Sequence, residues 1–368
     1  MSGLSSSFSR LARAIFHLFA VMFAVMGALL GSAIVPCYSD AIVGAVRTVH
    51  LPIRGSVSDA EIRTSYKRPT TIPFPADNPY TVQKNILGKK LYFDSRLSRG
   101  KLLSCASCHS PGYAWSDGQP TSVGHLMKRL GRRSPTILNL AYGQIYMWDG
   151  RAESLEEQAL GPLQEAVEMA MPLDELLTQI KAIDEYHQLF EAAFPGEGIS
   201  AKNVGKAIAT FERTVISGRA PFDSWIEGDE NAVSDSAKRG FKLFNTKAQC
   251  VGCHSGWKFT DDSFHDIGLA SADIGRGKLL PNVVKSQYAF KTPGLREITR
   301  RAPYMHDGSI PDLENVIDHY DKGGLQRNSR SELIRPLDLT GSEKADLLAF
   351  LKTLTSDMEP TTFPMFPR

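Results

Sequence analysis

Four cysteines and two histidines stand in two matching frames of the sequence, CASCH at residues 105–109 and CVGCH at residues 250–254. In a C-x-x-C-H frame, two thiols about one helical turn apart can form thioethers with the two vinyl groups of one haem, and the adjacent histidine is carried under the iron. The sequence therefore predicts two covalently bound haems c. The attachment residues are Cys105, Cys108, Cys250 and Cys253, and the proximal iron ligands are His109 and His254.

Such cysteines could instead bind zinc or form disulfides. A four-cysteine zinc ribbon places its two C-x-x-C pairs about 15–20 residues apart. Here the pairs stand at 105–108 and 250–253, and zinc would leave both histidines unexplained. A disulfide inside a C-x-x-C pair is geometrically strained. We therefore expect haem rather than either alternative.

The N-terminus has the pattern of an export segment. Arg10 and Arg13 precede an uncharged apolar run at 14–35, which is typical of a secretory signal. At ~22 residues the run is also long enough to span a bilayer uncleaved. Small residues permit cleavage after Ala41, so residues 1–41, which include Cys37, are interpreted as a signal peptide or an N-terminal membrane anchor. Either one places the rest of the chain in the periplasm, where c-type haems are attached.

A weak internal repeat links the two frames. GKKLY at 88–92 precedes the first frame and GFKLF at 240–244 precedes the second. The repeat predicts a mostly α protein with two cytochrome-c-like haem domains, each with a short helix leading into its haem motif and with long irregular loops. We expect an N-terminal arm at 42–74, a first domain at 75–232 and a second at 233–368, with the boundary in the polar stretch 227–236. The net charge of +2 over 368 residues gives no sign of nucleic-acid binding.

Further helices are predicted from capping boxes and apolar periodicity. Capping boxes begin at Ser154 and Thr340, and residues 206–216 are amphipathic. Near the C-terminus, apolar side chains recur at i, i+3, i+4 and i+7 from Leu313 to Tyr320, which predicts one more helix. Tyr320 would face the interior, either as a core tyrosine with its hydroxyl hydrogen-bonded or as a metal ligand.

From about residue 85 to residue 355 the chain resembles the bacterial dihaem cytochrome c peroxidase and MauG family. The resemblance rests on three stretches: LGKKLYFDSRLS at 87–98, SPTILNLAYGQIYMWDGRAESLEEQALGPLQEAVEM at 134–169, and KTPGLREITRRAPYMHDGSIPDLENVIDHY at 291–320. It implies that peroxide reacts at the N-terminal haem and that the C-terminal haem stores and relays electrons. A small cytochrome or cupredoxin would be the donor, and the oligomeric state, monomer or homodimer, is left open.

The resemblance also implies roles for single residues around the first haem. Trp148 matches the tryptophan between the haems, where an aromatic ring can be oxidised transiently and relay electrons. Glu168 matches a distal carboxylate that can move a proton between the peroxide oxygens. Gln158 and Pro162 match other residues of that pocket. His125 stands where peroxidases of the family carry a histidine that caps the resting iron, whereas MauG lacks that ligand.

The second haem needs a sixth ligand, and two residues compete for that position. In the resemblance Tyr320 falls where peroxidases have methionine and MauG has tyrosine. Met305 is the rival, because methionine is a common haem ligand that raises the potential. We expect Tyr320, whose phenolate would favour ferric and more oxidised iron.

Calcium is doubtful in this chain. Family members hold the ion between the haems, and the resemblance puts Arg133 at an asparagine ligand and Arg301 at a threonine that binds through its carbonyl, while Pro303 is retained. Arg133 removes a side-chain oxygen and brings a cation to a place where Ca²⁺ needs oxygen ligands. A guanidinium there can instead pair with haem propionates.

Three functions are therefore considered. The main one is an exported dihaem peroxidase that reduces hydrogen peroxide at the first haem with electrons from the second. The alternatives are a MauG-type enzyme, which uses peroxide to oxidise residues of a partner protein, and a non-catalytic electron-transfer cytochrome. Tyr320 favours the MauG-type enzyme, His125 favours the peroxidase, and Glu168 argues against a carrier.

Overall fold

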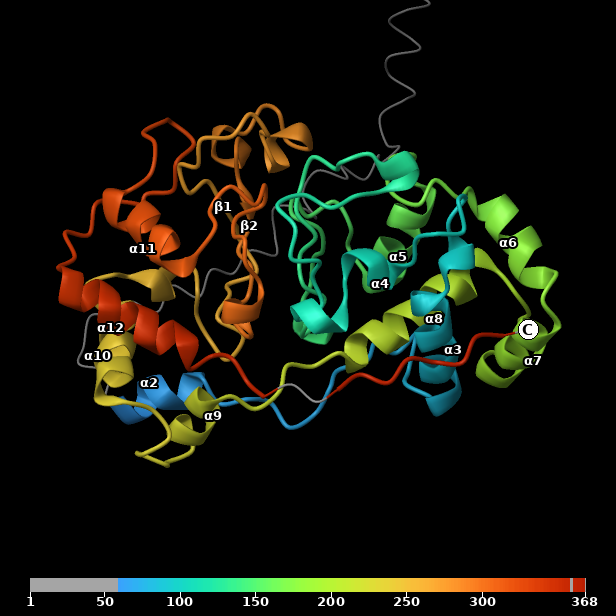
Figure 1. The fold of residues 1–368 in the computed structure, drawn as a ribbon, viewed down its shortest axis with the longest axis horizontal. Helices are drawn as coiled ribbons and strands as arrows, with labels where there is room; N and C mark the ends of the chain where they lie inside the picture. Colours follow the sequence, from blue (N-terminus) through green and yellow to red (C-terminus); the bar gives the residue numbers. More distant parts are fainter. Residues whose placement is uncertain (1–58, 358–359, 368) are drawn as a thin grey trace, which may run out of the picture. The chain divides into compact units, whose positions relative to one another are not determined.

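The computed structural model describes residues 59–357 and 360–367, which lie within one compact unit of the chain. It is rich in helix and has little sheet (Figure 1). The helices are α2 (Asp59–Ser65), α3 (Val82–Phe93), α4 (Cys105–Cys108), α5 (Leu155–Gln164), α6 (Leu173–Lys181), α7 (Asp184–Ala193), α8 (Ala201–Thr214), α9 (Pro221–Ile226), α10 (Asp235–Asn245), α11 (Leu313–Lys322) and α12 (Gly341–Lys352). Two short strands, β1 (Phe264–His265) and β2 (Phe290–Lys291), pair antiparallel. The mostly α prediction is confirmed.

The predicted export segment at 14–35 and its cleavage site lie outside the described residues. Within the described ranges, no helix is long and apolar enough to cross a membrane.

Two large apolar clusters form the interior. The first cluster is built around α3 and α8, where Tyr92 packs against Phe211 with ring centroids 5.1 Å apart. The second cluster is built around α10 and α12, where Phe244 and Phe350 pack with centroids 5.1 Å apart. Phe222 of α9 belongs to the second cluster although it precedes the expected boundary at 227–236, and that boundary stays a prediction.

The internal repeat of the sequence marks the same contact in both clusters. Gly88 of α3 lies against the backbone of α8, and Gly240 of α10 lies against the backbone of α12. A Cβ atom at either glycine would stand 1.9 Å from a carbonyl oxygen, that of Ala207 or of Asp346. The glycines therefore let two helix axes approach closely in each cluster, immediately before each C-x-x-C-H frame.

The helix predictions hold, with one shift. Ser154 caps α5 by accepting from the Glu157 amide, and Thr340 opens α12 with the predicted capping box. The helix expected at 206–216 begins earlier, at Ala201, because Ser200 caps it, and it ends at Thr214. The remaining long stretches, 109–154 and 254–312, consist mainly of loops with single 3-10 turns.

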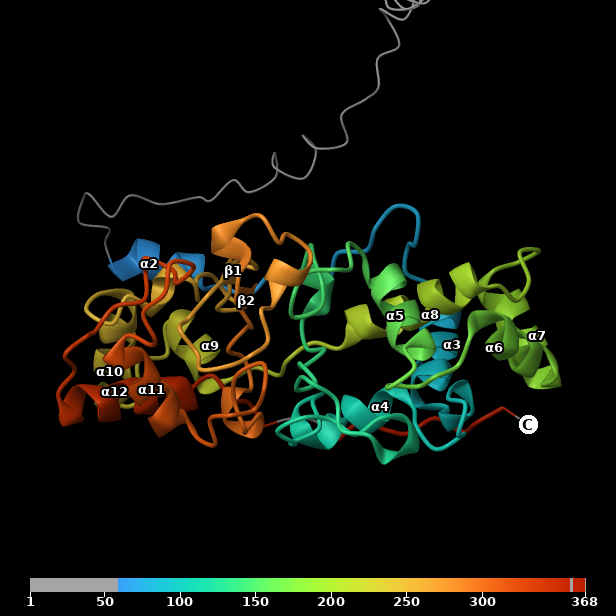
Figure 2. The ribbon, with the colours of Figure 1, turned by 90° about the horizontal axis from the view of Figure 1, so that it is seen from above.

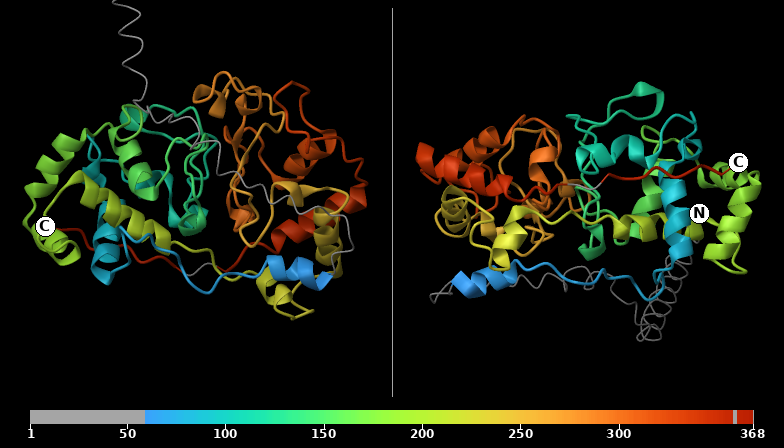
Figure 3. Two further views of the ribbon diagram at one scale, coloured as in Figure 1. Left: turned by 180° about the vertical axis from the view of Figure 1, so that it is seen from behind. Right: turned by 60° about the horizontal axis from the view of Figure 1, so that its bottom comes forward.

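The chain passes from the first cluster to the second through α9. Two further extended segments also connect the clusters. Tyr66 packs in the second cluster, while Asn78 reaches the first, where its amide donates to Glu156 Oε1 at 2.7 Å. The chain after α12 returns to α3, where Phe363 packs on Phe93 with centroids 5.2 Å apart. Figures 2 and 3 show this C-terminal stretch running beside α3.

Replacing Gly88 or Gly240 with alanine should destabilise the protein by about 1–3 kcal/mol, because the added methyl forces each helix pair apart. In an ordinary helix the same change stabilises by about 1 kcal/mol. Gly341→Ala is the matched control, since nothing lies within 4 Å of its Cβ position. Urea unfolding of the full chain measures the difference. Equal stabilities of the Gly88→Ala, Gly240→Ala and Gly341→Ala proteins would contradict the close-approach explanation.

Candidate active site

The first C-x-x-C-H frame folds into a single helical turn that ends at its histidine. Cys105 and Cys108 bound α4, and the His109 amide donates to the Cys105 carbonyl at 2.9 Å. The His109 ring donates from Nδ1 to the carbonyl of Pro135 at 2.8 Å. With Nδ1 occupied, Nε2 is the nitrogen left to bind a metal.

The second frame has the same arrangement on a 3-10 turn, Cys250–Gly252. The His254 amide donates to the Cys250 carbonyl at 2.8 Å, and His254 Nδ1 donates to the Phe259 carbonyl at 2.9 Å. Burial lowers the pKa of both His109 and His254, so both imidazoles are neutral, as a metal ligand must be. None of the four cysteines of the frames forms a disulfide in the structure. These residues therefore fit a haem at each frame.

Each histidine lines its own cavity. His109 lines a cavity of about 1180 Å³, and His254 lines one of about 1550 Å³, together with Cys250 and Cys253. Both volumes include space that is open to solvent at the cavity mouths.

Trp148 forms part of the wall of both cavities. Its indole N–H donates to the Arg133 carbonyl at 2.8 Å, and its own carbonyl accepts from the Lys291 amide at 2.8 Å. The indole ring is thus held by the backbone of one loop, and the Trp148 backbone is held by another. The relay role that the family resemblance implied for Trp148 stays a prediction.

Tyr320 and Met305 both line the cavity of His254, and Met305 also lines that of His109. Tyr320 is on the last turn of α11, which Asp312 caps and Gly323 ends, as predicted. Its hydroxyl has no hydrogen-bond partner among the described residues, and burial raises its pKa. Other enclosed tyrosines do have partners: Tyr92 donates to the His109 carbonyl at 2.9 Å.

The predicted distal residues divide into two groups. Gln158 of α5 lines the cavity of His109, and its Oε1 is buried without a partner. Pro162 is in the same helix. Glu168 is half-buried, and burial raises the pKa of its carboxyl. Pro162, Glu168 and His125 are all absent from the described residues that line the two cavities.

His125 and Glu168 are nevertheless neighbours. The His125 amide donates to the Glu168 carbonyl at 2.8 Å and to the Val167 carbonyl at 3.0 Å. Gly124 makes this approach feasible, because a Cβ there would lie 2.0 Å from the Val167 oxygen. The loop of His125 is therefore attached to the segment that carries the candidate proton-transfer carboxylate.

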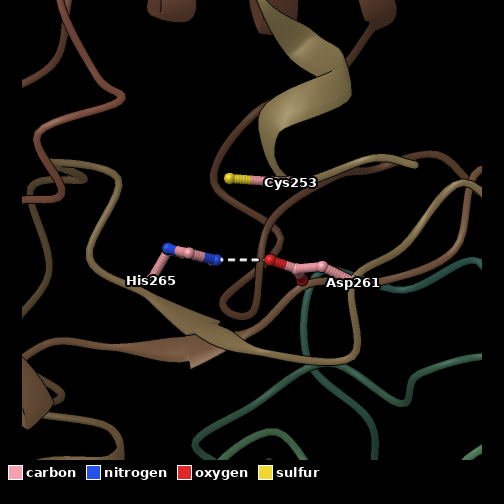
Figure 4. Close-up of side chains that lie close together, drawn as sticks. All are labelled: Cys253, Asp261 and His265. Carbon is pink, nitrogen blue, oxygen red and sulfur yellow. Dashed lines mark hydrogen bonds and ion pairs between the residues drawn. The ribbon is translucent and has the colours of Figure 1, made fainter. Parts of the chain in front are cut away.

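Cys253 also lies beside an ion pair (Figure 4). His265 Nε2 and Asp261 Oδ2 are 2.7 Å apart, and both lie within 4.8 Å of the Cys253 sulfur. Burial opposes charge on His265, but hydrogen bonds with Asp261 and Cys253 raise its pKa to about 10. A thioether at Cys253 would use the sulfur for haem attachment. We therefore assign no separate metal to this trio.

A group of cationic side chains was not identified from the sequence. Besides Arg133 and Arg301, three basic residues of the second half line the His109 cavity, with one carboxylate between them: Lys258, Lys291, Arg296 and Asp262. Lys258 Nζ lies 2.7 Å and Lys291 Nζ 2.9 Å from Asp262. Spacing alone could not reveal the group, because loops far apart in the chain supply its members.

Ion pairs join the loops in front of the two cavities. Arg132 pairs with Asp149 at 2.7 Å and with Asp273 at 2.6 Å. Burial opposes ionisation of both carboxyls, but the hydrogen bonds from Arg132 hold their pKa values below the ordinary range. Arg276 adds a bond to the Asp149 carbonyl at 2.8 Å. These contacts attach the loop that carries Trp148 to the loop that precedes β2.

Comparison with known proteins gives consistent relatives. A family model described as "Di-haem cytochrome c peroxidase" matches residues 82–231. The chain is 50% identical to the methylamine utilization protein MauG of Methylorubrum extorquens, covering 84% of this chain and 88% of that protein. It is 35% identical to a cytochrome-c peroxidase of Pseudomonas sp., covering 84% and 90%. A solved MauG-like protein associated with microbial copper homeostasis superposes with a TM-score of 0.73 at 33% identity, covering 79% and 95%.

Replacing Arg132 with glutamine should destabilise the protein by about 1–3 kcal/mol, because two largely buried carboxylates lose their shared partner. Arg99→Gln is the control, since the Arg99–Glu175 pair is exposed and such pairs contribute less than about 1 kcal/mol. The measurement is urea unfolding of the full chain at several pH values.

The pH dependence of this difference follows from the depressed pKa values. The stabilisation by Asp149 and Asp273 is fully present above the pKa of an unfolded aspartate, about 3.9, and is lost as pH falls through the lower folded values. The difference in the free energy of unfolding between wild type and Arg132→Gln should therefore narrow only in acid. Equal free energies of unfolding at pH 7 would contradict the role given to Arg132.

Proposed function

Since the chain belongs to the di-haem cytochrome c peroxidase family, whose members include MauG, it is a haem-dependent oxidoreductase, and we propose that it reduces hydrogen peroxide at one of two haem sites joined through Trp148. One observation supports this most strongly. Trp148 lines two large cavities, and each cavity contains the histidine of one C-x-x-C-H frame.

The haem-holding residues follow from the fit of the two frames. Cys105 and Cys108 would attach the first haem, and Cys250 and Cys253 the second, with His109 and His254 as iron ligands. Two cytochrome-c-like domains, at 75–232 and 233–368, would each hold one haem. The two glycine-mediated helix pairs, one in each apolar cluster, support this assignment.

A bound haem would supply the iron at which peroxide is reduced and would store the electrons for that reduction. The overall reaction consumes two electrons and two protons for each H₂O₂ and releases two water molecules. Gln158 Oε1, which has no partner, can accept a hydrogen bond from a peroxide O–H in the first cavity. Glu168, whose pKa is raised, can carry a proton at a less acidic pH than an exposed glutamate.

Tyr320 is proposed as a second residue, besides His254, that would hold the haem at the second frame. Its hydroxyl lies in the cavity wall without a protein partner, unlike the hydrogen-bonded core tyrosine that was the alternative. A metal cation can reverse the effect of burial on a phenol by stabilising the phenolate. Met305 stays the rival, because it lines the same cavity.

A second candidate function is the oxidation of residues in a partner protein, as in MauG. The 50% identity to a methylamine utilization protein and the position of Tyr320 favour it over a carrier cytochrome. In the peroxidase function, the electron donor would be a small cytochrome or cupredoxin. We place the protein in the periplasm, because haem attachment at C-x-x-C-H frames and the N-terminal basic and apolar segment both indicate export.

Haem attachment can be tested by mass spectrometry of the denatured protein and by counting haem iron. Wild type should carry two covalent haems per chain. Replacing both Cys105 and Cys108 with alanine should remove one haem, and replacing both Cys250 and Cys253 should remove the other. Ser107→Ala, within the same turn as the first pair, is the control and should retain two. A wild-type protein that binds zinc and no haem would refute the proposal.

The proposed reaction can be tested by adding one equivalent of hydrogen peroxide to the fully ferric protein and following its visible and near-infrared spectrum. A rapid spectral change without prior reduction would indicate an open first site and a tyrosine-ligated second site. Tyr320→Phe should then slow the change by roughly tenfold or more, equal to about 1.4 kcal/mol of barrier. Met305→Leu should react like wild type.

The opposite pattern has a defined meaning as well. A slow change that becomes rapid after one-electron reduction would mean that His125 caps the first site and that the protein is an activatable peroxidase. A strong effect of Met305→Leu together with no effect of Tyr320→Phe would assign the axial position to Met305. No reaction with peroxide in either redox state would refute the peroxidase proposal and favour a carrier.

A further inference from the structure

Two buried arginines meet at the wall of the His109 cavity. Arg133 and Arg301 are 6% and 5% exposed, and both line this cavity. Arg133 Nη2 donates to the Arg301 carbonyl at 2.7 Å, and Arg301 Nη2 donates to the Gly294 carbonyl at 2.6 Å. Each guanidinium is thus held by neutral carbonyl groups.

Neither arginine forms an ion pair with a carboxylate of the described residues, and only Asp117 and Glu297 act on them from a longer distance. Among the described residues, no aspartate or glutamate lies within ion-pair distance of Arg133 or Arg301, whereas nearby Arg296 pairs with Asp223 at 2.8 Å. The Nε atoms of Arg133 and Arg301 are buried without any hydrogen-bond partner. Leaving a charge buried and unpaired costs several kcal/mol. Two such cations side by side therefore indicate that an anionic group binds in the cavity that they line.

A haem carries that kind of group. Its two propionate carboxylates can accept bidentate hydrogen bonds from guanidinium groups. Lys258 and Lys291 line the same cavity and share a single carboxylate, Asp262, which adds to the positive field. This step rests on the proposed haem in the His109 cavity.

The same contacts do not fit a calcium ion. Calcium needs several oxygen ligands, and the Arg301 carbonyl, which the family resemblance marked as a ligand, already accepts from Arg133. A divalent cation beside two guanidinium groups would also be repelled. The residues therefore disagree with the calcium site that the family would imply.

We propose that the Arg133 guanidinium is the resident cation at this junction, joining the Arg301 carbonyl to a haem carboxylate in place of a calcium ion. The arrangement is coupled to Trp148 through the backbone of the same residue. The Arg133 carbonyl accepts from the Trp148 indole, and the Arg133 amide donates to the His306 carbonyl at 2.7 Å. A side-chain substitution at Arg133 removes the cation and keeps both backbone bonds.

The test begins with calcium content. Wild-type holoprotein, purified without a chelator and analysed by atomic emission, should contain far less than one calcium per chain. Its visible spectrum and thermal transition should be the same in EDTA and in calcium chloride. Arg133→Asn should shift the spectrum and lower the transition temperature in EDTA, and calcium chloride should bring both back toward wild type. Arg133→Lys, which keeps the charge, should be affected less than Arg133→Asn.

Arg219→Asn is the matched control, because it removes one exposed arginine that pairs only with Glu227. It should respond to neither EDTA nor calcium. One calcium per wild-type chain, lost in EDTA together with a spectral change, would overturn the proposal, as would an Arg133→Asn protein indistinguishable from Arg219→Asn. The wild-type calcium result stands even if Arg133→Asn fails to fold. A haem count on each sample separates these outcomes from failure of the proposed function, in which no haem would be bound.

Discussion

The structure depends on holding two imidazole rings in one orientation, each in the wall of its own cavity. Each ring is fixed twice, by a backbone bond to the first cysteine of its frame and by an Nδ1–H bond to a carbonyl in the following loop. The short turns of His109 and His254 are too small to be stable alone. Their positions are set by the helix pairs below them, where Gly88 and Gly240 allow a close backbone approach. Packing in each cluster is thereby transmitted to the direction of a metal-binding nitrogen.

The wall between the cavities combines an aromatic ring with a group of charged side chains. Trp148 lines both cavities and is hydrogen-bonded to Arg133, whose side chain reaches the Arg301 carbonyl. The Arg132 ion pairs tie the adjoining loops together. Because these loops have almost no regular secondary structure, side-chain charge and backbone hydrogen bonds replace a sheet as the scaffold. Because the Trp148 indole bonds to the backbone of Arg133, a change in charge at this wall would alter the field at either site and leave that bond in place.

Polar groups without partners show where the protein is completed by what it binds. The Gln158 carbonyl oxygen, the Tyr320 hydroxyl and the Nε atoms of Arg133 and Arg301 have no hydrogen-bond partner among the described residues. In contrast, Tyr92 and Tyr186 are buried with satisfied hydroxyls and serve packing. Buried polar groups are rarely left unpaired in native proteins, and the unpaired atoms of Gln158, Arg133 and Arg301 all belong to residues that line the His109 cavity.

The sequence alone determined the local features of this protein. The two C-x-x-C-H frames, the caps at Ser154 and Thr340 and the apolar period ending at Tyr320 are short-range patterns, so their chemistry and their helices could be predicted. Only the tertiary structure decided the features that depend on contacts between distant segments of the chain. It placed Trp148 in two cavity walls, bonded the His125 loop to the Glu168 segment, and gathered Lys258, Lys291 and Arg296 around one cavity. These groupings come from loops without periodicity, whose paths are fixed only when distant segments bury a common cavity.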